Sequence, residues 1–373
     1  MKRAVFISCF NSYDNRVKPY IDVFLNNGYK IRYLYADFDH MTKEYHEKIY
    51  KNGVCIHVKR YKRNISLSRL LSHYLFSKKT IKYIKDYKPD FIYCMVPPNS
   101  LVKKIGLYKK THADVKVVFD VYDMWPESFP CSGKINFILK IPFGYWRNLR
   151  KNYIGYADML FGVSEEGKNF LSKETNEKPI EVIRPIVPVG EMPKYNPATD
   201  ELSFCYLGMV NHIIDMELGV FLLGELAKVK KTVLHIIGEG QYLQCFTETL
   251  SDVGVEVVCH GCVFDQSEKN KIFSLCNMGL NIPRKEIDST MSLKAVEYMR
   301  VGLPFINNAN GEMRRIVEED EIGLNVNTDI KILIKEILDT KKSDYMKMHE
   351  NCIESYKSRF INQDYESVLQ SFI

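Results

Sequence analysis

Short apolar runs alternate with helical patterns along the whole chain. The first run, residues 4–7, is followed by an amphipathic pattern over 17–27, a glycine, and a second apolar run over 31–36. Further runs of strand type lie at 55–58, 91–94, 115–120 and 202–207. Continuous apolar strands separated by helices are typical of parallel sheets that are covered on both faces. The pattern therefore predicts an α/β fold with parallel sheets.

A proline-rich stretch without hydrophobic periodicity separates the chain into two such series. Prolines stand at positions 185, 188, 193 and 197, and this predicts a linker near residues 185–200. We therefore predict an N-terminal domain over residues 1–190 and a second domain over 200–345, followed by helices over 346–373. A chain of 373 residues is long enough for two ordinary domains.

The composition indicates a globular protein of the cytoplasm. Hydrophobic residues make up 46% and charged residues 26% of the chain, as in ordinary globular domains. No apolar run approaches the ~20 residues that span a bilayer, and the N-terminus lacks a signal-peptide pattern. The scattered cysteines fit a reducing compartment. Cys259 and Cys262 have no second pair to complete a zinc site, so we expect both to be core residues at a strand end.

Two basic stretches lie in the N-terminal half. Residues 59–88 carry leucines and tyrosines at helical spacing among lysines and arginines, and residues 134–156 combine basic with aromatic residues. Such stretches can lie on an anionic membrane face. They can equally be helices with apolar residues toward the core and solvated lysines opposite. Their occurrence in the same half favours peripheral membrane contact. No nucleic-acid reader module accompanies them, which argues against nucleic acid as a partner.

The most informative stretch is residues 288–306, DSTMSLKAVEYMRVGLPFI. A short helix over 293–300 follows Ser292, Gly302 stops it, and an apolar strand follows. The N-terminus of such a helix offers unpaired N–H groups and the positive end of a helix dipole, which suits a phosphate. Glu297, one turn further on, could accept from the two hydroxyls of a ribose. The alternative is an ordinary helix-to-strand connection with a solvated glutamate.

The pattern S-L-K-A-V-E-Y-M-x-x-G-L-P-F-I resembles the donor-site signature of family 4 glycosyltransferases of the GT-B fold. The resemblance implies two Rossmann-like domains facing each other across a cleft, with a C-terminal helix that crosses back to the first domain. It implies that the second domain binds a nucleotide-sugar, with Glu297 on the ribose. The other implied donor-binding residues are Ser292, Leu293, Thr290, Lys294, Gly208, Gly238 and Arg284.

The sequence departs from that family at the expected phosphate-binding cations. Where most relatives place an arginine and a lysine after the glycine that matches Gly208, this chain has Met209 and Asp215, and Ser289 replaces the family's first glutamate. The diphosphate charge must then fall on the helix N-terminus, on Lys294, or on Arg284 and its neighbour. Otherwise the donor binds weakly, is unusual, or is not bound at all.

On the acceptor side, the run D-x-x-D-x-W-P-E-S at 120–128 resembles sugar transferases that act on lipid-linked oligosaccharides. Asp123, at the carboxyl end of a strand, suits a carboxylate that orients or deprotonates a sugar hydroxyl; alternatively it caps the turn around Pro126. Asp14 and Arg16 match a loop that reaches toward the acceptor in the family. They could equally be a helix N-cap and a surface charge.

Taken together, these features predict transfer of a sugar from a UDP- or GDP-sugar to a saccharide or polyprenyl-diphosphate-linked acceptor. The resemblance implies a retaining, metal-independent reaction without a cofactor, in capsule or O-antigen biosynthesis. We expect a cytoplasmic protein, with the two basic stretches favouring peripheral contact at the inner face of the cytoplasmic membrane. Two other classes stay open. One is a nucleotide-sugar epimerase on the same fold, and the other is a non-catalytic relative that acts as a binding subunit.

Overall fold

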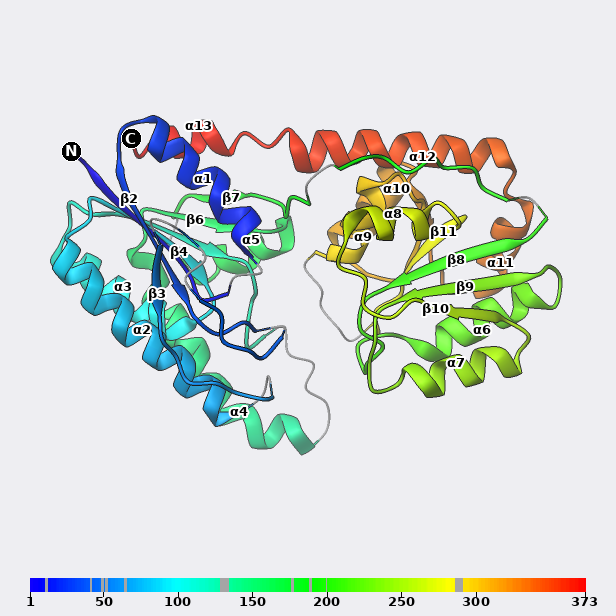
Figure 1. The fold of residues 1–373 in the computed structure, drawn as a ribbon, viewed down its shortest axis with the longest axis horizontal. Coiled ribbons are helices and arrows are strands. Elements are labelled where there is room, and N and C mark those ends of the chain that lie inside the picture. The colour runs from blue at the N-terminus through cyan, green and yellow to red at the C-terminus, as the bar shows by residue number, and fades with distance from the viewer. Residues whose placement is uncertain are drawn as a thin grey trace. The chain divides into compact units, whose positions relative to one another are not determined.

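The computed structural model describes most of the chain as two compact units. The described residues are 1–10, 13–40, 42–47, 50, 53–63, 66–127, 134–175, 178–187, 190–198, 200–285 and 291–373, with backbone alone over 134–140. Unit 1 consists of Met1–Arg184 together with Gln363–Ile373, and unit 2 of Pro185–Asn362. Each unit is a parallel sheet between layers of helices (Figure 1).

Unit 1 holds a sheet of seven parallel strands in the order β3-β2-β1-β4-β5-β6-β7. The strands are β1 (Arg3–Ser8), β2 (Lys30–Ala36), β3 (Gly53–Ile56), β4 (Phe91–Val96), β5 (Lys116–Val121), β6 (Met159–Gly162) and β7 (Ile180–Val182). The α-helices are α1 (Asp14–Asn26), α2 (Leu67–Tyr87), α3 (Asn99–Thr111), α4 (Lys134–Lys151), α5 (Glu165–Ser172) and α13 (Tyr365–Gln370).

Alternating strand residues of unit 1 build two cores, one on each face of the sheet. Val5 and Ile7 pack with apolar residues of α2 and α3, whereas Ala4 and Phe6 pack with those of α1 and α13. This alternation is the period of two that a strand imposes, and because both faces are buried the strand reads as continuously apolar.

Unit 2 holds six parallel strands in the order β10-β9-β8-β11-β12-β13. They are β8 (Leu202–Leu207), β9 (Thr232–Ile237), β10 (Glu256–Cys259), β11 (Met278–Asn281), β12 (Phe305–Asn307) and β13 (Gly323–Asn325). The α-helices are α6 (Met216–Ala227), α7 (Leu243–Asp252), α8 (Gln266–Phe273), α9 (Leu293–Arg300), α10 (Glu312–Glu319), α11 (Ile330–Asp339) and α12 (Lys342–Tyr356).

The predicted α/β fold with two Rossmann-like parallel sheets is confirmed. In both sheets the strand order reverses beside the first strand, between β1 and β4 in unit 1 and between β8 and β11 in unit 2. Open α/β sheets bind ligands outside the carboxyl ends of the strands at such a reversal. A ligand is therefore expected at the loops that follow these strands.

The segment Gln363–Ile373 is packed into unit 1. The ring of Tyr365 lies 5.2 Å from that of Tyr20 in α1, and the ring of Phe372 lies 5.6 Å from that of Phe91 in β4. The Lys2 ammonium donates to the main-chain oxygen of Ile373 at 2.7 Å. Unit 1 is thus assembled from two stretches of sequence that are far apart.

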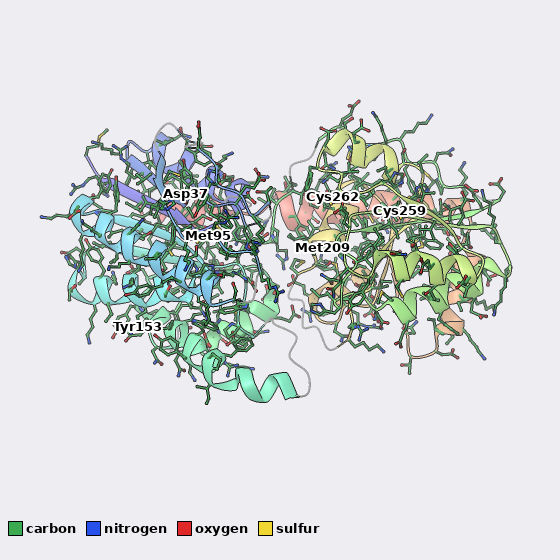
Figure 2. The ribbon with its side chains drawn as sticks, turned by 60° about the horizontal axis from the view of Figure 1, so that its bottom comes forward. Asp37, Met95, Tyr153, Met209, Cys259 and Cys262 are labelled. Carbon is green, nitrogen blue, oxygen red and sulfur yellow. The ribbon has the colours of Figure 1, made fainter. Side chains whose placement is uncertain are left out.

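Two local expectations are corrected. Cys259 and Cys262, both labelled in Figure 2, are exposed rather than core residues. Cys259 is the last residue of β10, which is an edge strand of the sheet in unit 2. Helix α1 begins at Asp14 rather than at Val17, so Asp14 and Arg16 belong to its first turn and not to the preceding loop. Among the described helices, none has the length and apolar character needed to cross a membrane.

Candidate donor and acceptor sites

Helix α9 begins without a side-chain cap. Its N-cap residue, Ser292, is buried, and the Ser292 hydroxyl donates to Asn281 Oδ1 at 2.7 Å instead of accepting from the first turn of the helix. A serine at this position usually satisfies one of the unpaired N–H groups of the helix. Here that hydroxyl is engaged elsewhere, so the N–H groups at the start of α9 receive no bond from the N-cap side chain.

A buried row of asparagines fixes the position of that serine. Asn281, Asn307 and Asn325 are the last residues of β11, β12 and β13, and all three are buried. Asn281 donates to Asn307 Oδ1 at 2.7 Å, and Asn307 donates to Asn325 Oδ1 at 2.7 Å. Sequence reasoning missed this row, although an asparagine at the end of three successive apolar runs was visible. The row holds the N-terminus of α9 at the carboxyl edge of the sheet.

Lys294 brings a cation to the end of β8. Its ammonium donates to the Tyr206 hydroxyl at 3.0 Å and lies 4.3 Å from the centre of the Tyr206 ring. A Cβ atom placed on Gly208 would lie 3.6 Å from Lys294 Nζ, so the lysine is directly beside the strand end. Burial lowers the pKa of Lys294 to about 8, because a low-dielectric surrounding disfavours the charged form.

Gly208 and Gly238 let two neighbouring loops approach each other closely. Both have positive φ, 122° and 144°. A Cβ atom on Gly238 would lie 2.1 Å from the carbonyl oxygen of Gly208. Because neither residue has a side chain, the backbone beside Lys294 stays uncovered, as expected where a backbone must come close to a ligand.

We expect Gly238→Ala to destabilise unit 2 by more than ~1–3 kcal/mol, the range for a strained backbone alone, because the added Cβ atom would also meet a backbone oxygen. Gly261→Ala is the matched control, since its φ is +67° but no atom lies within 4 Å of the added Cβ. Urea unfolding followed by far-ultraviolet circular dichroism measures both. Equal losses in the two variants would contradict the close approach.

The positions where cations were expected have other roles or none. The carboxylate of Asp215 accepts from the Leu218 N–H at 3.1 Å and caps α6. Met209, which is labelled in Figure 2, replaces the arginine and has an exposed side chain, 60% by relative area. Arg284 is exposed, and its Nε atom lies 3.4 Å from the Ile214 carbonyl oxygen. Thr290 lies outside the described residues. Lys294 is therefore the predicted cation that the structure places beside Gly208.

Glu297 is held between two cations. The Lys269 ammonium lies 3.0 Å from Glu297 Oε1 and the Arg300 guanidinium 3.2 Å from Oε2. The glutamate side chain is only 15% exposed, so the alternative of a solvated Glu297 is wrong. Arg300 is fully buried and also donates to Asn270 Oδ1 at 2.9 Å. Sequence reasoning missed both cations, although Arg300 stands one helical turn after Glu297.

In unit 1, Arg16 is part of a buried ion pair. Its guanidinium donates to both carboxylate oxygens of Asp120, at 2.6 and 2.9 Å. The Tyr93 hydroxyl also donates to Asp120, and all three residues are buried. The alternative of a surface charge for Arg16 is therefore wrong.

Asp14 is buried and accepts from the Tyr33 hydroxyl at 2.5 Å. Burial raises the pKa of its carboxyl group. It is the first residue of α1, whose N-cap is Tyr13, so the N-cap alternative for Asp14 is also wrong. Asp14 and Arg16 thus fix the first turn of α1 at the carboxyl edge of the sheet.

Asp123 lies half-buried in the loop after β5. Its backbone N–H lies 3.4 Å from the Val96 carbonyl oxygen, which ties this loop to the end of β4. Burial raises the pKa of Tyr13, and the charge of Asp123 raises it further, so the aspartate lies near the start of α1. Its predicted role on the acceptor stays a prediction.

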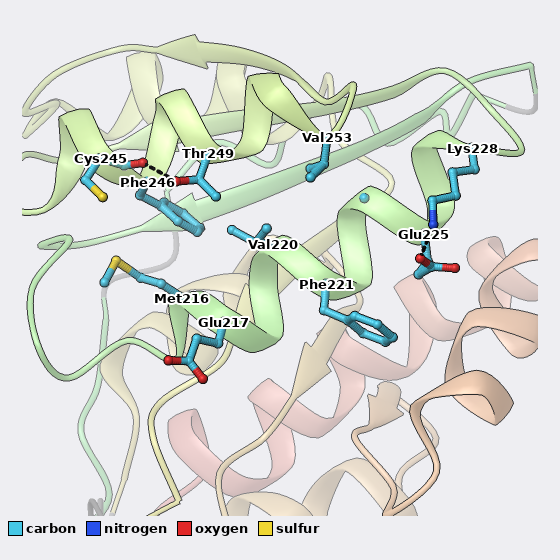
Figure 3. Close-up of a pocket in the computed structure, with 11 residues that line it drawn as sticks. Met216, Glu217, Val220, Phe221, Glu225, Lys228, Cys245, Phe246, Thr249 and Val253 are labelled. Atoms are coloured by element: carbon cyan, nitrogen blue, oxygen red, sulfur yellow. Dashed lines mark hydrogen bonds and ion pairs between the residues drawn. The ribbon is translucent and has the colours of Figure 1, made fainter.

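Unit 2 also holds an apolar cavity of 450 Å³ between α6 and α7. Figure 3 shows Met216, Val220 and Phe221 on α6, Phe246 on α7 and Val253 just after the end of α7. Among the described residues, none of those predicted for the donor lines it. No group of three or more metal-ligating side chains of His, Cys, Asp or Glu occurs in the described part of the chain.

Much of unit 2 is similar to a known protein family. Residues 204–341 match the family of group 1 glycosyl transferases. This stretch of unit 2 is therefore similar to a group 1 glycosyltransferase domain. The match begins in β8 and runs through α9 to α11, so it includes Gly208, Lys294 and Glu297. The predicted enzyme class, a glycosyltransferase, is thereby confirmed for this part of the chain.

Solved structures extend the likeness to both units. Sucrose-phosphate synthase from Thermosynechococcus elongatus is 14% identical, with a TM-score of 0.72 over 100% of this chain and 98% of that chain. The Anabaena protein HepE, in complex with UDP and glucose, is 14% identical with a TM-score of 0.67 over 100% of both chains. The lipopolysaccharide outer core galactosyltransferase WaaB is 16% identical with a TM-score of 0.64, again over 100% of both chains. No curated protein matches the sequence. These likenesses confirm the predicted GT-B fold of two Rossmann-like units.

Proposed function

We propose that the chain transfers a sugar from a nucleotide-sugar to a saccharide acceptor. The observation that carries this proposal is the pairing of the uncapped start of α9 with the Lys294 ammonium beside Gly208. A helix N-terminus and an adjacent cation together suit a diphosphate. Lys294 then takes the role of the arginine and lysine that Met209 and Asp215 replace.

The nucleotide would extend from that diphosphate toward Glu297. We propose that the Glu297 carboxylate accepts from the ribose hydroxyls while Arg300 keeps hold of it from the buried side. Lys269 would either keep its ion pair with Glu297 or release it when the ribose binds. HepE was solved with UDP, which supports a UDP-sugar, and a GDP-sugar is the other donor to test.

The chemistry that this arrangement favours is departure of a nucleoside diphosphate. Negative charge develops on the leaving phosphate, and preorganised donors directed at that charge lower the barrier. Lys294 and the first amides of α9, including that of Leu293, would supply those donors. We propose a retaining reaction of the family 4 type that needs neither a metal ion nor a cofactor.

On the acceptor side we propose that Asp123 orients or deprotonates the sugar hydroxyl that attacks. Asp14 and Arg16 would contribute on this side only by fixing the local structure. Asp14 accepts a hydrogen bond from Tyr33, and Arg16 forms an ion pair with Asp120. They would hold the start of α1 close to the loop that carries Asp123.

We propose a polyprenyl-diphosphate-linked acceptor and a place in capsule or O-antigen biosynthesis, at the inner face of the cytoplasmic membrane. Support comes from exposed apolar residues in the basic stretches 59–88 and 134–156, namely Leu67, Leu71, Tyr74, Ile141 and Tyr145. Apolar side chains among lysines suit an anionic interface. WaaB, a lipopolysaccharide galactosyltransferase, offers a similar fold.

Calorimetric titration of UDP, GDP and their sugars into wild type and Glu297→Ala tests the donor site. We expect one nucleotide to bind wild type and the variant to lose at least about tenfold in affinity, since hydrogen bonds to a charged group contribute ~1.5–3 kcal/mol. Glu248→Ala, an exposed glutamate on α7, is the control and should bind as wild type does. Absence of binding by any of these nucleotides to wild type would refute the proposed transferase.

A further inference from the structure

A buried tyrosine lies beside the cation of the candidate donor site. Tyr206, in β8, is buried, whereas Lys294, in the first turn of α9, is half-buried. The Tyr206 hydroxyl accepts from the Lys294 ammonium at 3.0 Å and donates to the Met209 carbonyl oxygen at 3.0 Å. One hydroxyl group therefore joins the cation on α9 to the loop that follows β8.

The chemistry of the three groups fixes the direction of these two hydrogen bonds. Burial raises the pKa of Tyr206, so its hydroxyl keeps its proton. An ammonium can only donate and a carbonyl oxygen can only accept, so this proton points to Met209 and a lone pair points to Lys294. The ammonium also lies 4.3 Å from the centre of the Tyr206 ring, whose face attracts a cation. Tyr206 thus contacts the ammonium through both its oxygen and its ring.

The protein does not neutralise the charge of this ammonium within the residues that the structure describes. In that part of the chain, the hydrogen-bond partner of Lys294 is the neutral Tyr206 hydroxyl, and no carboxylate forms an ion pair with Lys294. An ammonium has three N–H groups, and Tyr206 accepts from one of them. Two N–H groups of a half-buried cation therefore remain for an anionic ligand.

The packing of α9 on β8 explains why Lys294 and Tyr206 meet. Tyr298 follows Lys294 by four residues, so both side chains lie on one face of α9. The Tyr298 hydroxyl accepts from the Leu207 N–H at 2.9 Å and donates to the Cys205 carbonyl oxygen at 3.1 Å. These bonds hold that face of the helix against β8 at the residues on either side of Tyr206. The helix thus brings Lys294 to Tyr206, and the Tyr206 hydroxyl fixes the position of the ammonium.

We propose that Tyr206 is a positioning residue, which holds the Lys294 ammonium at the end of β8 and leaves its other two N–H groups available to the donor phosphate. The inference rests on the proposed function, since that function supplies the phosphate. A lysine side chain has many rotamers, and ordering it when a ligand binds costs conformational entropy. Because Tyr206 orders the side chain beforehand, the donor binds without that cost. Tyr206 contacts no substrate in this role and acts only through Lys294.

A double-mutant cycle on nucleotide binding tests this role. The probe is UDP or GDP, whichever binds wild type, titrated by calorimetry at pH 7. Tyr206→Phe keeps the ring but removes the oxygen, and we expect about a tenfold loss of affinity because a hydrogen bond to a charged group is lost. In the Lys294→Met background the same change should have no further effect, since the group that Tyr206 positions is gone. Losses that simply add in the double variant would overturn the proposal.

The pH dependence of nucleotide affinity separates positioning from a merely structural effect. Loss of the Tyr206 oxygen removes an acceptor that favours the charged form of Lys294, so the pKa of Lys294 should fall. The pH above which affinity declines should then move down by about one unit in Tyr206→Phe. Tyr195→Phe is the matched control, because Tyr195 is a buried tyrosine of unit 2 whose hydroxyl donates to the Asn277 carbonyl oxygen at 2.8 Å. The control should keep the wild-type profile, and an unshifted profile in Tyr206→Phe would overturn the proposal.

Carbon-13 NMR of the lysine Cε atoms measures the same pair without any nucleotide. The Lys294 signal is the one that Lys294→Arg lacks, and its pKa is titrated in wild type, Tyr206→Phe and Tyr195→Phe. We expect a lower pKa of Lys294 in Tyr206→Phe alone. Nucleotide binding by wild type together with equal Lys294 pKa values in the three proteins would refute the role of Tyr206 alone. Absence of nucleotide binding by wild type would instead refute the transferase, and with it the donor role of this pair.

Discussion

Replacing Lys294 with methionine is expected to weaken binding of the nucleotide-sugar by about 10–150-fold. The ammonium is the cation beside Gly208, and a charge-assisted bond to a phosphate contributes ~1.5–3 kcal/mol. Methionine keeps the apolar stem that packs in this region but cannot donate. Calorimetric titration of the nucleotide that binds wild type measures the loss. Unchanged affinity would show that Arg284 or the N–H groups at the start of α9 stabilise the diphosphate charge instead.

The same site should show a characteristic pH dependence. Burial lowers the pKa of Lys294 to about 8 in the free protein, and a bound diphosphate would raise that pKa by stabilising the ammonium. Affinity should therefore be constant below about pH 8 and fall by up to roughly tenfold per pH unit above it, since binding then requires uptake of a proton.

Lys294→Arg provides the control for that pH profile, since a guanidinium stays charged throughout this range. Its affinity should be flat from pH 7 to about pH 10, whatever its absolute value. A profile for Lys294→Arg that falls as steeply as wild type would assign the titration to another group.

Arg16→Met is expected to destabilise unit 1 by about 3–5 kcal/mol, since it leaves the Asp120 carboxylate buried without its cation. Asp120 is fully buried, so water cannot replace the guanidinium. Both tryptophans lie in unit 1, and urea unfolding followed by tryptophan fluorescence therefore reports on this unit.

Arg147→Met is the matched control for the ion pair. Arg147 contacts Glu127 at 2.8 Å but is half exposed, and such surface pairs contribute about 0–1 kcal/mol. The double variant Arg16→Met with Asp120→Leu should recover part of the loss, because no unpaired charge remains. A loss in Arg16→Met no larger than that in Arg147→Met would contradict the buried pair.

The two sheets and the position of helix α9 were predictable because they depend on local sequence patterns. Apolar runs of four to seven residues, such as Ala4–Ile7, reveal strands that are buried on both faces, and glycines at strand and helix ends reveal the turns. The helix that follows Ser292 shows its start, its stop and the next strand within one stretch of sequence. For these features, a short segment contains all the information.

The contacts that decide side-chain roles were not predictable, because they join distant segments. Arg16 meets Asp120 across 104 residues, and Lys269 meets Glu297 across 28. Which pairs meet depends on strand order and helix rotation, neither of which leaves a local signal. This is why a surface charge for Arg16 and a solvated Glu297 both stayed open as alternatives.

The segment Gln363–Ile373 sets the order in which the two units can finish folding during synthesis. A ribosome adds about 5–20 residues per second from the N-terminus, so residues 1–184 emerge well before this segment does. Until it arrives, Tyr20 lacks its contact with the Tyr365 ring and Phe91 its contact with the Phe372 ring. Pro185–Asn362 can meanwhile fold as a continuous piece. Unit 1 is thus the first to be made and the last to be completed.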